Sequence, residues 1–293
     1  MKEIIKVGYL LSYDYEYIFT SLKQVYEYAD KIIISYDING KTWAGNDFHI
    51  SAKVFDQLKA LDKDSKITLY GDNFFVPGKK TMELETRQRT MMAEKMGKGG
   101  WHLQIDSDEY VVDFEKLSAF LRKRKNYLNN PEKTPLNFYV RFVTLFKQDE
   151  DGYFIIDSFS EPCFMVTNVP SYEIARYPRN HRFLLLNIYC IHQSWARTKD
   201  EIKQKITNWG HNEDFDSEQF ISKWNDLNKE NYTGPQYRNF HPLVAETWKG
   251  LIYFEAKTID EFIDKFSAKF PTPSQILPKL SLKKKLKLYF GKY

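Results

Sequence analysis

Short apolar runs alternate with helix-like segments over the first third of the chain. The predicted strands cover residues 7–11, 31–36, 67–70 and 101–105, and the predicted helices cover residues 15–28, 50–61 and 82–96. We expect Asp14 to cap the first helix. Strands that alternate with helices form βαβ units, which have right-handed crossovers. The pattern therefore predicts an α/β fold with a mixed, mainly parallel sheet flanked by helices.

The pattern changes in the middle of the chain. Strand-like runs cover residues 136–146, 153–156, 163–166 and 183–191, and helical spacing returns over 198–209. From about residue 226 the pattern indicates helices and loops. No low-complexity linker separates these parts. We therefore predict one domain over residues 1–225 and a helical C-terminal extension over 226–293.

Acidic residues follow three of the predicted parallel strands. Asp37, Asp72 and Asp106 each come at the carboxyl end of an apolar run. In open α/β sheets, ligands bind outside the carboxyl ends of the strands. The sequence therefore predicts a polar binding site at this edge of the sheet.

Composition places the chain among globular proteins. Apolar residues make up 42% and charged residues 28%, which is ordinary for a soluble, folded chain. The two cysteines, Cys163 and Cys190, suggest neither a disulfide framework nor a zinc site. No apolar stretch is long enough for a membrane span, and the first residues do not resemble a signal peptide. These features favour a cytoplasmic protein.

Positive charge is concentrated at the C-terminus. Six lysines lie within the last fifteen residues, at positions 279, 283, 284, 285, 287 and 292. They alternate with apolar residues, so the segment 277–293 is expected to lie on an anionic membrane surface at the inner face of the membrane. A solvated helix is the alternative. Because the rest of the chain is nearly neutral, we expect no nucleic-acid partner.

The motif Asp106-Ser107-Asp108 suits a divalent cation. Mg²⁺ and Mn²⁺ prefer oxygen ligands, and a cation can bridge the phosphates of a nucleotide diphosphate. Two acids one residue apart are common in solvated turns, so the motif alone is weak. Its position after a buried strand and two βα units favours a metal site.

The first 110 residues resemble family 2 glycosyltransferases of the GT-A, Rossmann-like type. The strand and acidic motif at 100–109 carry most of the resemblance. It implies a nucleotide-sugar donor, with UDP-sugar expected, Mn²⁺ or Mg²⁺ as cofactor, and a saccharide or lipid-linked saccharide acceptor in surface polysaccharide or lipopolysaccharide synthesis. It also assigns donor contacts to Asp37 and Asp106, and diphosphate contacts to Arg87 or Arg89.

The turn after the first strand departs from many relatives. It reads Ser12-Tyr13-Asp14-Tyr15-Glu16, where many relatives have Asn-Glu. We assign Tyr13 to stacking on the uracil.

A second block at 191–205 also resembles GT-A transferases. There a His after a strand precedes an Arg/Ser turn and a helix that carries Lys. In the family this His can complete the metal sphere, so His192 joins Asp106 and Asp108 as a candidate ligand. The alternative is a His packed against Trp195.

The catalytic base has no motif of its own. An inverting transferase needs an Asp or Glu that accepts the proton of the acceptor hydroxyl. Glu161, between a polar loop and a strand, is preferred, and Glu173 is the second choice. The acids at 149–151 precede Gly152 and are interpreted as a solvated hairpin. If none serves, a retaining mechanism is the alternative.

Two other function classes stay open. One is a metal-dependent nucleotidyltransferase, although residues 7–16 lack its Gly-rich, basic turn. The other is a non-catalytic protein that binds a saccharide or nucleotide on a transferase-like fold.

Overall fold

We describe a computed structural model of the protein. The description covers residues 3–159, 161–178, 182–208, 216–244 and 247–279. The predicted membrane-binding tail, 277–293, falls almost entirely outside these residues. In the described part of the chain, no helix is both long and apolar enough to span a bilayer.

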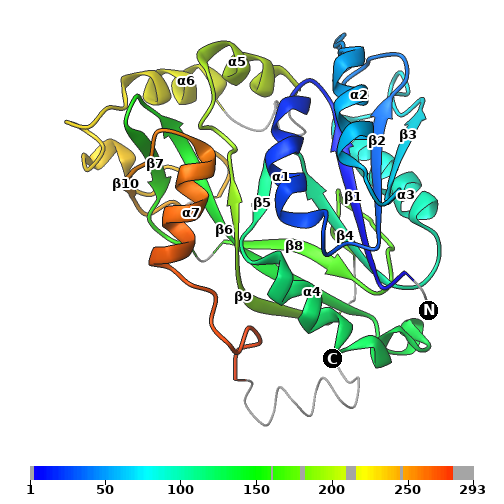
Figure 1. Cartoon of the computed structure of the whole chain (residues 1–293). Coiled ribbons are helices and arrows are strands. Elements are labelled where there is room, and N and C mark those ends of the chain that lie inside the picture. Colours follow the sequence, from blue (N-terminus) through cyan, green and yellow to red (C-terminus); the bar gives the residue numbers. More distant parts are fainter. Residues whose placement is uncertain (1–2, 160, 179–181, 209–215, 245–246, 280–293) are drawn as a thin grey trace.

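Four parallel strands form the N-terminal half of the sheet, in the order β4-β1-β2-β3. The strands are β1 (Ile5–Leu11), β2 (Lys31–Asp37), β3 (Ile67–Asp72) and β4 (Trp101–Asp106). The helices between them are α1 (Ile18–Val25), α2 (Ala52–Leu61) and α3 (Thr81–Met96) (Figure 1). The α/β class predicted from the sequence is confirmed. All these elements lie within a few residues of their predicted positions.

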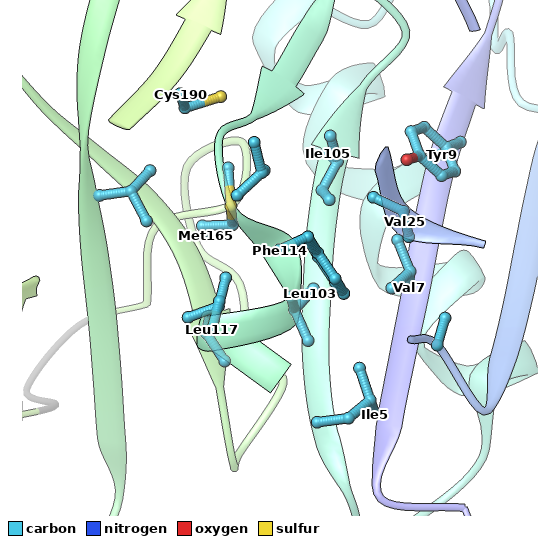
Figure 2. Packing of buried hydrophobic residues seen from close by; sticks show 14 of the residues in the cluster. Ile5, Val7, Tyr9, Val25, Leu103, Ile105, Phe114, Leu117, Met165 and Cys190 are labelled. Atoms are coloured by element: carbon cyan, nitrogen blue, oxygen red, sulfur yellow. The ribbon is translucent and has the colours of Figure 1, made fainter. Parts of the chain in front are cut away.

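Helices cover both faces of these strands because alternate residues point to opposite sides. Val7 and Tyr9 belong to the large core that α1, α2 and α4 (Phe114–Arg122) also form. Leu10 packs with Met92 of α3 on the other face. Figure 2 shows Phe114 and Leu117 of α4 beside Leu103 of β4.

The second half of the sheet is mostly antiparallel. Its strands are β5 (Glu109–Val111), β6 (Leu136–Gln148), β7 (Gly152–Ile156), β8 (Pro162–Thr167), β9 (Arg182–His192) and β10 (Leu251–Glu255). The order β10-β7-β6-β8 joins the parallel half at β4, and β9 pairs with both β5 and β6.

Two helical layers cover β6 and β7. One consists of α7 (Ile259–Lys269), which packs on Val143 and Ile155. The other consists of α5 (Lys199–Asn208) and α6 (Ser217–Asp226), which pack on Phe146 and Phe154. The strand alternation again separates the two cores.

Several local predictions were wrong. The first helix begins as a 3-10 turn (Tyr15–Tyr17), and Asp14 makes no capping hydrogen bond. Neither β5 nor α4 was predicted. The segment from residue 226 onward contains α7, but it also contributes β10, which pairs with β7. The boundary proposed at 225/226 stays a prediction.

We expect the buried face of β2 to be costly to truncate. Ile32→Ala, at a fully buried position, should lower the free energy of unfolding by about 2–5 kcal/mol, because it leaves a cavity in the core. Ile38→Ala, at a side chain that is 60% exposed, should change it by less than about 0.5 kcal/mol. Urea denaturation of both variants checks this. Equal losses would contradict the packing described.

Candidate functional site

A cavity of ≈ 760 Å³ opens at the carboxyl ends of β1, β2 and β4. Its walls include residues 10–14, 41–43, 106–109, 175–177 and 241–244. Thr42 donates a hydrogen bond of 2.7 Å to Asn208, so the loop after β2 is tied to α5. The cavity lies where the strand pattern predicted a site, and both halves of the sheet contribute to it.

Each of the three acids at the end of β4 and the start of β5 pairs with an arginine from a different segment. Asp106 accepts two hydrogen bonds from Arg89 of α3, at 2.9 and 3.1 Å. Glu109 accepts from Arg176, at 2.8 Å for one of the two bonds. Asp108 accepts from Arg197, which lies just before α5. All three arginines are buried, so each of their charges needs a carboxylate close by.

Two further groups approach Asp108. The Lys205 ammonium lies 3.3 Å from its Oδ2, and the Nε2 of His192 lies 3.6 Å from the same atom. Burial alone would raise the pKa of Asp108, but the charges of Lys205 and Arg197 hold it well below its usual range. Asp14 shares Arg197 with Asp108, at 3.0 Å. Asp108 is therefore ionised and shares its negative charge among several cations.

The pairing of β5 with β9 places His192 beside the motif. Glu109 and His192 are register partners, and the amide of Gln193 donates to the carbonyl of Asp108 at 2.9 Å. The imidazole stacks on Phe142, with ring centroids 4.6 Å apart. Burial lowers the pKa of His192 to about 4, so its ring is neutral at neutral pH.

Asp108 and His192 fit a divalent cation that also binds phosphate. The neutral imidazole nitrogen of His192 and the carboxylate oxygen of Asp108 lie 3.6 Å apart, so one metal ion can contact both atoms. Among the described residues, no group of three or more His, Cys, Asp or Glu side chains is arranged for a metal. This does not exclude a metal that binds with its ligand, since Mg²⁺ usually takes one or two carboxylates plus substrate phosphates and waters. Asp106, predicted as a ligand, instead directs both oxygens to Arg89.

Asp37 lines the cavity, but its carboxylate is occupied by backbone amides. Its Oδ1 accepts from the amides of residues 39 and 41, and its Oδ2 from those of residues 74 and 75. Asp37 thus joins two loops at the cavity wall. Arg87 lies outside the cavity lining and donates to the carbonyls of Asn73 and Phe74. Of the two predicted arginines, only Arg89 lines the cavity.

The two candidate bases have different surroundings. Glu161 lines the cavity, and burial raises the pKa of its carboxyl group. Its carbonyl accepts from the amide of Phe142, the residue that stacks on His192. Glu173 is exposed and does not line the cavity. Tyr13 lines the cavity, as its predicted role requires.

Three basic residues of the site had no assigned role in the sequence analysis. Arg197 and Lys205 belong to the block at 191–205, where the family resemblance indicated an Arg and a Lys. Arg176 follows Ala175, whose φ of 50° is unusual for a residue with a side chain. No motif or periodicity marks this loop, so only the fold reveals that Arg176 meets Glu109.

Comparisons with known proteins do not assign this chain to a family. No protein-family model and no curated protein match the chain. One similar structure is a mannose-6-phosphate isomerase from Helicobacter pylori, with 15% identity over 52% of this chain and 56% of that chain, at a TM-score of 0.30. Another is a mannose-1-phosphate geranyltransferase from Thermus thermophilus, with 10% identity over 76% of this chain and 68% of that chain, at a TM-score of 0.27. Such low TM-scores carry no argument about activity.

We expect the His192 imidazole to stay neutral well below about pH 6.5, the midpoint at which an unperturbed imidazole becomes protonated. In metal-free protein its NMR titration should have a midpoint near pH 4, because burial disfavours the charged ring. The variant His192→Asn would assign the signal. A midpoint near 6.5, the value of an unperturbed imidazole, would contradict a neutral His192 ring at this site.

Proposed function

We propose that this protein is a metal-dependent glycosyltransferase. It would move a sugar from a nucleotide diphosphate donor, with UDP-sugar expected, to a saccharide or lipid-linked saccharide. The observation that carries this proposal is a single cavity at the carboxyl ends of the parallel strands. That cavity contains Asp108 with His192 and, from the residue just before β8, the half-buried carboxyl of Glu161.

The donor would occupy the part of the cavity next to β1 and β2. Tyr13 and the loop at 41–43 are available to the nucleoside. Asp108 and His192 would hold the cation, and a bound Mn²⁺ or Mg²⁺ would offset the negative charge that develops on the leaving diphosphate. The carboxylate–arginine pairs keep Asp108 in place before any ligand arrives. Such preorganisation avoids reorganisation during the reaction.

Glu161 would act as the general base. Its carboxylate would accept the proton of an acceptor hydroxyl while that oxygen bonds to the anomeric carbon and the bond to the diphosphate oxygen breaks. The nucleoside diphosphate would leave, with inversion at the anomeric carbon. A raised pKa suits this role, because a base works best when its pKa lies near the working pH.

The rival reaction is nucleotidyl transfer, and its products differ. A nucleotidyltransferase would release pyrophosphate from a nucleoside triphosphate and a sugar phosphate. The turn after β1 carries Asp14, which pairs with Arg197, where such an enzyme usually has a Gly-rich, basic turn. A binding protein would release neither product.

A product assay tests the proposal and the base together. With a panel of nucleotide-sugars and saccharide acceptors, the wild type should release nucleoside diphosphate, and Glu161→Gln should slow this about 10²–10⁴-fold. The rate should fall as the pH drops through the raised pKa of Glu161, because the base becomes protonated.

Glu173→Gln, the matched change at the exposed glutamate, should keep the wild-type rate. Full activity in Glu161→Gln would remove Glu161 from the mechanism. Pyrophosphate release from a triphosphate and a sugar phosphate would replace the transferase proposal with nucleotidyl transfer.

A further inference from the structure

Lys205 is a second cation on a carboxylate that already has an arginine. Its side chain is only 9% exposed, and Lys205 is among the residues that line the cavity. Within the described residues, its ammonium makes one hydrogen bond, of 3.3 Å, to Asp108. It also lies 5.5 Å from the centre of the Trp195 ring. An ammonium has three donors, so most of its hydrogen-bonding capacity remains for a ligand in the cavity.

Arg197, the other cation on Asp108, is fixed in place. Its Nε donates to the carbonyls of Gln193 and Ser194, and its Nη2 to Asp14 as well as Asp108. Its side chain is fully buried. Asp108 would therefore keep a compensating charge if Lys205 left. Lys205 has a flexible four-carbon side chain and a single hydrogen bond to Asp108, so it is the partner that loses least by changing its contacts.

We propose that Lys205 exchanges partners when the donor binds. In the ligand-free protein its ammonium occupies Asp108, and in the donor complex it contacts the diphosphate while the divalent cation takes its place on the carboxylate. This inference rests on the proposed function and adds a leaving-group contact to it. Because the ammonium and the cation compete for one carboxylate, donor and metal would enter together.

If Lys205 exchanges partners, removing its charge should have opposite effects on Mn²⁺ binding and on UDP binding. Without nucleotide, Lys205 repels a cation at Asp108, so removing its charge should strengthen Mn²⁺ binding. With nucleotide, removing it deletes a charge-assisted contact to phosphate, so UDP should bind less tightly. A purely structural lysine would weaken both or change neither.

The test compares Lys205→Met with Lys203→Met. Lys203 lies on the same helix, but its side chain is 70% exposed and pairs with Asp200 at 3.8 Å. Mn²⁺ binding without nucleotide is measured by electron paramagnetic resonance. UDP and uridine binding with Mn²⁺ are measured by calorimetry. Circular dichroism and thermal melts confirm folding, and Lys205→Gln serves as the second neutral variant.

Lys205→Met should bind Mn²⁺ several-fold more tightly than the wild type, and UDP about ten- to a hundredfold more weakly, with uridine unchanged. Lys203→Met should match the wild type in all three. Weaker Mn²⁺ binding, or unchanged UDP binding, in Lys205→Met would contradict the partner exchange of Lys205 but not the proposed function. If wild-type protein bound no UDP at all, the proposed function would fail, and the exchange with it.

Discussion

The candidate site depends on three ion pairs between the closely spaced acids Asp106, Asp108 and Glu109 and buried arginines that are distant in sequence. Arg89, Arg176 and Arg197 come from α3, from an irregular loop and from the turn before α5. Removing one partner of a buried ion pair typically costs about 3–5 kcal/mol, since the other charge is left without compensation. The acidic motif therefore holds three otherwise separate segments at one edge of the sheet.

These ion pairs also explain how three carboxylates can lie close together in the site. The carboxylates at 106, 108 and 109 would repel one another without neighbouring cations. Arg89, Arg176 and Arg197 balance most of the negative charge of these three acids. A metal and a diphosphate bring opposite charges, so they suit such a site best when they bind as a pair. Lys205, the second cation on Asp108, also contributes positive charge to this balance.

The sheet brings the two sides of the site together by backbone pairing. Asp108 and His192 are adjacent because β5 pairs with β9, and Glu161 is adjacent to Phe142 because β8 pairs with β6. The parallel half supplies the acidic motif, and the antiparallel half supplies the histidine and the candidate base. Strand pairing thus brings together the residues at, or directly beside, the strand ends that form the site.

Local pattern was enough to predict part of this arrangement. The four parallel strands are visible as short apolar runs in the sequence. The acids at three of their ends follow these runs directly. The segment 109–111 is too short to show a strand pattern, and β10 is recognised only through its partner β7. Asp14 resembled a helix cap, but Arg197, far away in sequence, binds it instead. Glu173 and Arg176 share one loop, and only tertiary structure shows which of them enters the site.

The central claim is that Asp108 binds a metal together with a nucleoside diphosphate. Calorimetric titration of UDP with Mn²⁺, and then with chelator, tests it on the wild type and on Asp108→Asn, with Asp56→Asn at an exposed position as the control. We expect UDP binding to need both Mn²⁺ and Asp108 and to be unchanged in the control. UDP binding that survives chelator and Asp108→Asn, or no UDP binding under any condition, would contradict it.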